Sequence, residues 1–321
     1  MALNYQCIDA ASPYCPCYLA EINSCIVCSI VQGKETCDCR WQGFCVYQEF
    51  IWNGRRKKEP RRTLEVKIIE KRTVTNNLIV FKVSLPFPIL SREYSQPGTY
   101  AFLRAVNSPC YFEFPLCVMD TDDDKNALTF AMQIIGPKTR NLAQENRILL
   151  LRGPYYNGIF GLKHIKSSVN KKCLLIGRGI GQASLVLVAK TLVRGGNDIT
   201  AFLDPGAINC NPVRELLESL GVRVHVFEFS GSSYKKYLGE LIENGGYEII
   251  YSGGSQIQHN MIKNLVEKSG RKIALAVSNN AKMCCGEGVC GSCETLTGGE
   301  RLRLCKVQTD IHNVMGVNVY A

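Results

Sequence analysis

The cysteines of this 321-residue chain are numerous and unevenly placed, and they constrain its fold more than any other feature. Eight of the 17 cysteines lie between Cys7 and Cys45, and five lie between Cys284 and Cys305. A secreted disulfide scaffold would need a signal peptide, and the first ten residues lack the basic and apolar pattern of one. Because clustered thiols in a reducing compartment more often bind metal, we expect a cytoplasmic, metal-binding protein.

Four cysteines near the C-terminus have the spacing C-x4-C-x2-C…C, which is the ligand spacing of a plant-type [2Fe–2S] cluster. Three glycines among them (Gly286, Gly288 and Gly291) give the backbone the freedom that a loop needs when three thiolates converge. A zinc site and plain buried thiols are the alternatives, but zinc favours paired C-x2-C elements and only one such pair is present here. The predicted ligands are Cys285, Cys290, Cys293 and Cys305.

The pattern of apolar residues predicts a β-barrel or sandwich followed by an α/β domain. Residues 63–160 contain short stretches rich in branched side chains, punctuated by Gly, Pro, Asn and Asp, as in antiparallel β-structure. Residues 161–280 alternate strand and helix patterns, which predicts a doubly wound parallel sheet. The remaining segments are a cysteine-rich module at 1–54, a basic linker at 55–62 and a cluster lobe at 281–321.

Individual elements follow from the same patterns. In the first region we expect strands at 64–69, 78–83, 100–103, 116–119, 128–135 and 148–151. In the second region we expect strands at 173–176, 199–203, 222–227, 248–251 and 273–277. We expect one helix that follows the first glycine turn and ends at about residue 193, and three more at 213–220, 234–243 and 257–268.

The net charge of +10 is partly concentrated in a run that begins at Arg55 and ends with Arg61 and Arg62. A run of this kind is usually a solvated linker, and docking to an acidic partner is the alternative. No nucleic-acid recognition motif accompanies the run, so no nucleic-acid partner is expected. The chain contains no apolar run of 18 residues, so we expect no transmembrane helix.

Two glycine-rich turns follow expected strands of the parallel sheet. The first contains Gly177, Gly179, Ile180, Gly181 and Gln182, and the second contains Gly253 and Gly254. Glycines at such a turn allow a dinucleotide to approach the backbone, and the following helix N-terminus favours its pyrophosphate. The alternative is a tight packing turn. Glu228, after the third expected strand, could accept a ribose hydroxyl or be an ordinary solvated charge.

The order of barrel, nucleotide domain and cysteine lobe, together with four motifs, resembles the ferredoxin–NADP reductase superfamily. The closest likeness is to the electron-transfer subunits of dihydroorotate dehydrogenase and related NAD(P)H-dependent flavin and iron–sulfur subunits. The cysteine loop at 285–293 is one of these motifs, and the glycine turn at 177–184 is a second. The other two are the segment with Gly153, Pro154, Asn157 and Gly158, and the turn with Gly136, Lys138 and Thr139.

The resemblance implies that the barrel binds FAD and the α/β domain binds NAD(P)H. In the family, an R-P-x-S stretch before a strand carries an arginine for the flavin pyrophosphate. The matching residues here are Pro115, Leu116 and Cys117, and the arginine is absent. Arg104 or Arg140 could take its place.

The resemblance also implies an electron-transfer subunit that passes electrons between NAD(P)H, FAD, a [2Fe–2S] cluster and a catalytic partner subunit. Hydride transfer needs no acid or base, so no catalytic residue is predicted. One alternative is a self-contained NAD(P)H-dependent reductase that uses a ferredoxin as its partner. Another is a non-enzymatic iron–sulfur or redox-sensing module on a reductase scaffold.

The N-terminal cysteine-rich module lies outside this resemblance. A segment of this length has too little core to fold without a staple. Four of its thiolates could bind a second iron–sulfur cluster or a structural zinc, and free or disulfide-bonded cysteines are the remaining alternative. The candidate ligands are Cys25, Cys28, Cys37, Cys39 and Cys45, and Cys7, Cys15 and Cys17 add three more thiols.

Overall fold

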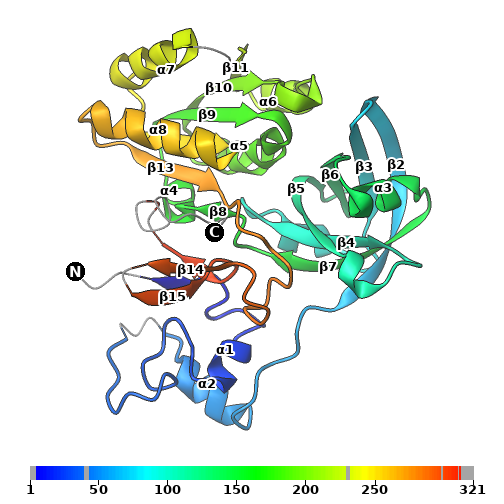
Figure 1. Cartoon of the computed structure of the whole chain (residues 1–321), viewed down its shortest axis with the longest axis vertical. Helices are drawn as coiled ribbons and strands as arrows, with labels where there is room; N and C mark the ends of the chain where they lie inside the picture. Colours follow the sequence, from blue (N-terminus) through cyan, green and yellow to red (C-terminus); the bar gives the residue numbers. More distant parts are fainter. Residues whose placement is uncertain (1–4, 40–42, 229–231, 298, 310, 312–321) are drawn as a thin grey trace. The chain divides into compact units, whose positions relative to one another are not determined.

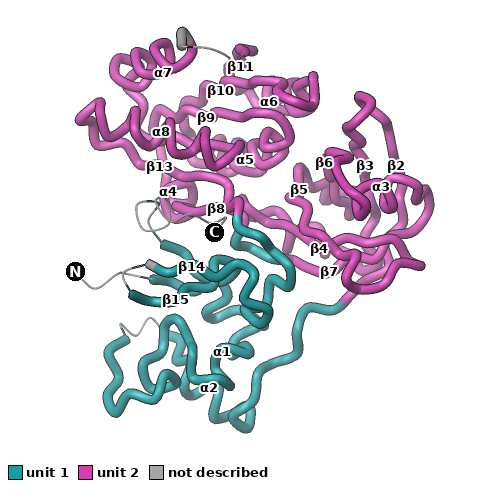
Figure 2. Tube along the Cα trace, viewed as in Figure 1, with its two compact units in different colours: residues 1–62, 155–157, 281–321 teal, residues 63–154, 158–280 magenta. Residues whose placement is uncertain are grey.

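A computed structural model of the chain describes residues 5–39, 43–228, 232–297, 299–309 and 311. The chain forms two compact units (Figure 2). Unit 1 combines residues 1–62, 155–157 and 281–321, and unit 2 combines residues 63–154 and 158–280. The two cysteine-rich segments, which are far apart in the sequence, therefore belong to the same unit.

The first half of unit 2 is a closed six-stranded barrel with the strand order β2-β3-β6-β5-β4-β7 (Figure 1). Its long first strand pairs with β7 from Thr63 to Lys67 and with β3 from Lys67 to Thr75. The second pairing includes a register shift between Ile68 and Glu70. One strand thus closes the barrel by pairing on both sides. The strands are β2 (Thr63–Thr75), β3 (Leu78–Ser84), β4 (Tyr100–Ala105), β5 (Phe114–Asp122), β6 (Ala127–Gln133) and β7 (Ile148–Tyr155).

The second half of unit 2 is a six-stranded sheet with the order β11-β10-β9-β12-β13-β8, parallel except for β8. The central strand β9 contains four consecutive buried residues, Cys173–Ile176, as expected for a strand covered on both faces. The order reverses between β9 and β12, which makes this the topological switch point. The strands are β8 (Ile159–Phe160), β9 (Lys172–Arg178), β10 (Asp198–Asp204), β11 (Arg223–Val226), β12 (Ile249–Gly253) and β13 (Ala274–Ser278).

The helices of this sheet fall into two groups that follow from its winding. Right-handed crossovers place helices from opposite directions of winding on opposite faces. Helix α5 contacts α4 and α6, whereas α7 contacts α8. The helices are α4 (Leu162–Lys166), α5 (Leu185–Arg194), α6 (Arg214–Ser219), α7 (Ser232–Asn244) and α8 (Gln256–Lys268). The predicted barrel and doubly wound sheet are both confirmed.

The barrel and the sheet share apolar and polar contacts within unit 2. Leu187 of α5 belongs to the same buried cluster as the barrel residues Phe81 and Phe130. Lys190, one turn further along, forms an ion pair with Asp120 of β5. These contacts hold the carboxyl end of β9 close to one side of the barrel.

Unit 1 joins the two ends of the chain. Strand β1 (Gln6–Cys7) pairs with β16 (Val307–Gln308), and β14 (Glu294–Thr297) pairs with β15 (Glu300–Arg303). A small core gathers around helices α1 (Tyr18–Glu21) and α2 (Val46–Trp52). Its buried members are Cys15, Ala20, Cys25, Cys28, Val31 and Val46. Three of these six are cysteines, so thiols replace much of the aliphatic core of an ordinary small domain.

A buried group of four charges also lies in unit 1, and we refer to it as the ion quartet. It consists of Asp9, Arg61, Glu287 and Lys306. The expectation of a solvated basic run holds for Arg55 and its neighbours but is wrong for Arg61, whose side chain is 0% exposed. Burial alone would raise the pKa of Asp9, but the nearby positive charges of Lys306 and Arg61 hold this pKa below its ordinary range.

Among the described residues, no helix is both long and apolar enough to cross a bilayer. The longest helices, α7 and α8, have 13 residues each.

The buried His259 of α8 predicts a specific loss of stability in acid. Its ring nitrogens lie 2.9 Å from the Ser252 hydroxyl and 3.0 Å from the Ser278 hydroxyl, and burial lowers its pKa to about 4. The folded state therefore favours the neutral ring. Its contribution is complete above about pH 6.5 and is lost as the pH falls toward 4, by roughly 3 kcal/mol in the free energy of unfolding.

Urea unfolding at several pH values between 7 and 4 measures this dependence. We expect His259→Asn to flatten it, and we expect a change at the exposed His225 (His225→Asn) to leave it in place. An equal pH dependence in the wild type and in His259→Asn would contradict the assignment.

Candidate nucleotide, flavin and cluster sites

The two glycine turns meet at the switch point of the sheet. Gly177 and Gly253 are paired in register at the ends of β9 and β12. A Cβ added to Gly181 would lie 2.6 Å from the carbonyl carbon of Gly253 and 2.6 Å from the nitrogen of Gly254. No side chain fits there, so glycine is required for the two backbones to approach each other. The contact brings both predicted turns together at the place where doubly wound sheets bind nucleotides.

A buried glutamine lies beside each turn. Gln182 donates from its Nε2 to the carbonyl of Asp204 at 2.8 Å and to Asn211 Oδ1 at 2.9 Å. Gln258 of α8 donates to Ser252 Oγ at 3.1 Å. Within the described chain, the amide oxygens of both glutamines are buried without a hydrogen-bond partner. Since buried polar atoms are normally paired, these oxygens fit a site that a polar ligand completes.

An acidic residue that the sequence reasoning passed over lies beside the first turn. Asp204 ends β10, next to β9, and its Oδ2 lies 2.9 Å from Arg178 Nε. The loop after it approaches the turn, because a Cβ on Gly206 would lie 3.3 Å from the nitrogen of Gly179. Glu228, which was considered as a ribose acceptor or an ordinary solvated charge, is exposed after the edge strand β11. Asp204 is the better-placed carboxylate, and its position directly after an apolar strand was the available signal.

The predicted flavin strand lies beside the nucleotide turn. Strand β5, which contains Pro115, Leu116 and Cys117, pairs with β4 and contacts the 3₁₀ segment η3 (Gly179–Ser184). Gly136 caps helix α3 (Pro137–Gln144), and the Thr139 hydroxyl accepts hydrogen bonds from the backbone N–H groups of Ile135 and Gly136. A Cβ on Gly136 would meet no atom within 4 Å, so this turn is open.

Cations are present near β5 despite the missing family arginine. Arg152 of β7 donates two hydrogen bonds to Glu113 at 2.8 and 3.1 Å, and Arg104 of β4 lies 3.6 Å from the same carboxylate. Two guanidinium groups thus share one carboxylate, and the group keeps a net positive charge. Lys138 donates to the backbone carbonyl of Glu113, and Arg140 is exposed on α3. Arg152, which was not predicted, joins Arg104 as a candidate partner for a diphosphate.

The segment with Gly153 and Gly158 has mainly packing contacts. A Cβ on Gly153 would lie 3.3 Å from the Tyr94 ring, and one on Gly158 would overlap the Gly98 carbonyl. Asn157 is fully buried in unit 1, where its Nδ2 donates to the carbonyls of Leu304 at 2.6 Å and Val307 at 2.8 Å. Asn157 therefore braces the backbone on both sides of Cys305. Its predicted role at a flavin, with that of Pro154, stays a prediction.

The four predicted cluster thiols share one loop and its neighbouring strand end in unit 1. Gly286, Gly288 and Gly291 have φ values of 72°, 76° and 78°, which confirms the need for glycine there. The Glu287 backbone N–H donates to Cys285 Sγ at 3.3 Å. A hydrogen bond with Cys305 lowers the pKa of Cys293. Although burial opposes the change, hydrogen bonds with Ser292, and then with Cys285, lower the pKa of Cys290.

This donor set fits an iron–sulfur cluster, because it offers four soft thiols with the ligand spacing of a plant-type cluster. Within the ranges that the structure describes, no group of three or more Cys, His, Asp or Glu side chains is close enough together to hold a metal ion.

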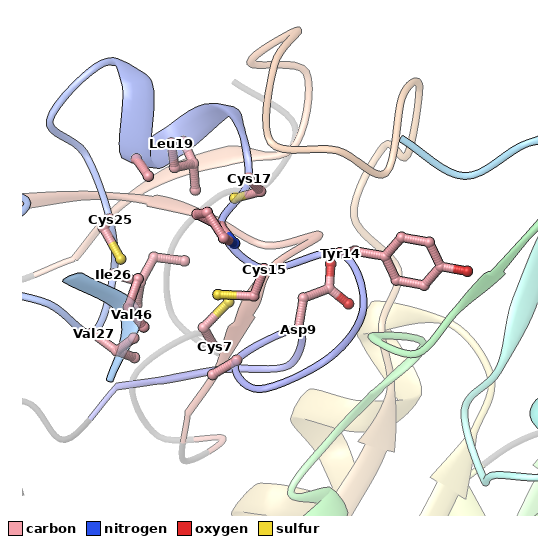
Figure 3. A pocket seen from close by; sticks show the side chains of 13 residues that line it. Cys7, Asp9, Tyr14, Cys15, Cys17, Leu19, Cys25, Ile26, Val27 and Val46 are labelled. Carbon is pink, nitrogen blue, oxygen red and sulfur yellow. The ribbon is translucent and has the colours of Figure 1, made fainter. Parts of the chain in front are cut away.

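Four of the eight N-terminal cysteines line one cavity, and two others have their sulfurs in contact. Cys7, Cys15, Cys17 and Cys25 line one small cavity, and Figure 3 shows the sulfurs of Cys15, Cys17 and Cys25 facing the space between them. Burial raises the pKa of Cys15 to about 12 and that of Cys25 to about 11. Cys37 and Cys39 are not among the residues that line this cavity, and their Sγ atoms lie 3.2 Å from each other. Cys25 and Cys28 belong to the same small core, so Cys25 lies next to a second predicted ligand as well as beside this cavity.

No family model matches the chain. Its sequence is 26% identical over 213 residues to the dihydroorotate dehydrogenase B (NAD(+)) electron transfer subunit of Clostridium acetobutylicum, which covers 66% of this chain and 82% of the relative. It is 27% identical over 220 residues to the same subunit of Streptococcus thermophilus, covering 66% and 83%. The chain is a homologue of these electron-transfer subunits.

Solved structures show the same fold. An NADH-dependent reduced ferredoxin–NADP oxidoreductase matches with a TM-score of 0.61 and 22% identity, over 75% of this chain and 85% of the other. The ferredoxin reductase of a carbazole 1,9a-dioxygenase matches with a TM-score of 0.54 and 15% identity, over 68% and 69%. The fold is therefore that of the ferredoxin reductases, as the sequence resemblance predicted.

The contact between the glycine turns predicts the effect of a single methyl group. We expect Gly181→Ala to force the turns apart, to weaken NAD(P)H binding about tenfold or more, and to lower stability by about 1–3 kcal/mol. Isothermal titration and thermal unfolding measure the two effects.

Gly239→Ala in α7 is the matched control, because its added Cβ would lie at an ordinary 3.5 Å from Leu265. Its expected effect is unchanged binding and a gain of roughly 0.5–1 kcal/mol in stability. Nucleotide binding by Gly181→Ala at the wild-type affinity would remove the turn from the site.

Proposed function

We propose that this protein is the electron-transfer subunit of a multi-subunit oxidoreductase. In this proposal it passes electrons between NAD(P)H, FAD and a [2Fe–2S] cluster, and to or from a catalytic partner subunit. The observation that carries the proposal is the close contact of the two glycine turns beside strand β5 of a closed barrel. The named function of the sequence relatives supports the same assignment.

Each part of the chain has a separate task in this proposal. The turns around Gly181 and Gly253 accept the dinucleotide, with Asp204 placed for its ribose and Arg178 beside it. Strand β5, the Gly136 turn and the cations Arg104 and Arg152 hold the flavin. Cys285, Cys290, Cys293 and Cys305 hold the cluster. When bound, the flavin and the cluster would together convert two-electron nicotinamide chemistry into single-electron transfer.

A redox titration tests the proposal as a whole. The chain is purified anaerobically and titrated with NADH and then NADPH, while the visible spectrum is recorded. We expect a stoichiometric amount of reduced nicotinamide nucleotide to bleach both flavin and iron–sulfur absorbance. Whichever of NADH and NADPH causes this bleaching is identified as the physiological nucleotide. No response to either nucleotide after addition of FAD would refute the electron-transfer function.

The same preparation separates the proposed function from a self-contained reductase. Rapid turnover with an added ferredoxin and no partner subunit would favour the reductase. The expected cytoplasmic location stays a prediction.

We also propose that the N-terminal thiols hold metal in two separate centres. The inner centre would use Cys7, Cys15, Cys17 and Cys25, and the outer one Cys28, Cys37, Cys39 and Cys45. Four thiolates suit zinc as well as an iron–sulfur cluster. The four cysteines of the inner set line one cavity, and a metal there would staple a segment that has little aliphatic core.

Metal analysis of three variants tests the division into two centres. We expect Cys15→Ser and Cys39→Ser each to lose one centre, and Cys110→Ser, in which an exposed thiol of the barrel region is removed, to lose none. Iron with acid-labile sulfide identifies clusters, and zinc alone identifies structural sites. Full metal content in both N-terminal variants would leave these cysteines as plain thiols.

A further inference from the structure

The ion quartet links the N-terminal segment to the predicted cluster loop by short contacts. The Asp9 carboxylate contacts Arg61 Nη2 at 2.7 Å and Lys306 Nζ at 2.6 Å. Glu287 contacts Arg61 Nη1 and Lys306 Nζ, each at 3.3 Å. The side chains of Arg61 and Lys306 are 0% exposed, that of Asp9 is 3% exposed and that of Glu287 is 17% exposed. Charges this deeply buried are scarcely screened by solvent, so they act strongly on their surroundings.

Aromatic side chains complete the enclosure of the quartet. The Arg61 guanidinium lies 3.9 Å from the ring centroid of Tyr14 and 4.3 Å from that of Tyr155. The Tyr155 hydroxyl lies 2.7 Å from Glu287 Oε1. Both rings restrict the guanidinium to one position, in which it reaches the two carboxylates at once.

The quartet touches both ends of the predicted ligand set. Glu287 follows Cys285 by two residues, and its backbone N–H donates to the Cys285 sulfur at 3.3 Å. Lys306 directly follows Cys305, and its carbonyl accepts a hydrogen bond from the backbone of Ile8 at 2.9 Å. Hydrogen bonds to cluster sulfurs and nearby charge are both known controls of a cluster's potential. Asp9 and Arg61 contact the cluster loop and its last ligand's neighbour through these two residues.

We infer that Asp9 and Arg61 of the N-terminal segment are positioning residues that set the reduction potential of the [2Fe–2S] cluster through Glu287 and Lys306. The inference rests on the proposed cluster. The quartet is balanced, with two positive and two negative charges. Removal of one member therefore leaves a buried unit charge, and its sign decides whether an added electron is favoured.

The test is an EPR-monitored redox titration of the full chain, isolated with its cofactors. Asp9→Asn keeps the side-chain shape and leaves a net positive quartet, so we expect a higher cluster potential. Lys306→Met leaves a net negative quartet, so we expect a lower one. Glu35→Gln removes the same charge as Asp9→Asn from an exposed site in unit 1, and we expect no shift. A purely structural role would not produce shifts of opposite sign.

Tyr155→Phe covers the case in which a charge variant fails to keep its cluster. It removes the donor to Glu287 without changing the charge of the quartet, and we expect a lower potential and an altered EPR line shape. Unchanged potentials, or shifts of one sign in Asp9→Asn and Lys306→Met, would overturn the inference while the cluster itself stands. A wild-type chain without a [2Fe–2S] signal would instead overturn the proposed cluster, and the inference with it.

Discussion

The contact between Gly181 and the end of β12 is the constraint on which the arrangement of unit 2 depends. Two parallel strands that diverge at a switch point leave a crevice at their carboxyl ends. Here the two turns close the base of that crevice backbone to backbone, and a Cβ on Gly181 would lie only 2.6 Å from backbone atoms of Gly253 and Gly254, so only glycine fits. Because the turn also contacts β5, the position of the barrel strand is set by the same few residues. The chain therefore brings its predicted nucleotide and flavin sites together through close backbone packing, to which the Lys190–Asp120 ion pair adds a polar contact.

Much of this unit could be predicted from the sequence because its signals are local. Four consecutive apolar residues in β9 and the glycines after them indicate a central strand and its turn within ten positions. The cluster loop is similar, because its ligand spacing and its glycines lie within a single short segment. Fold class and the cysteine motif follow from such patterns without knowledge of any distant contact.

The organisation of unit 1 could not be predicted because its determinants are non-local. Strands β1 and β16 have two residues each and are separated by about three hundred positions, so neither has a periodic pattern. Arg61 follows a solvated basic run, and nothing beside it in the sequence indicates that it is buried against Tyr14 and Tyr155. Asn157 matches a family turn, yet its amide supports the backbone around Cys305. A local pattern identifies a residue type but does not identify its partner.

The cost of burying charge explains why the two ends of the chain need each other. Glu287 and Lys306 lie in the cluster lobe, and alone they would form one ion pair with unsatisfied hydrogen-bonding capacity. Desolvation of such a pair often outweighs its attraction unless further groups complete it. Asp9 and Arg61 supply those groups, and Tyr155 supplies a neutral donor. Residues 1–62 are thus a structural part of the cluster lobe, because Asp9 and Arg61 complete the buried ion pairs of Glu287 and Lys306.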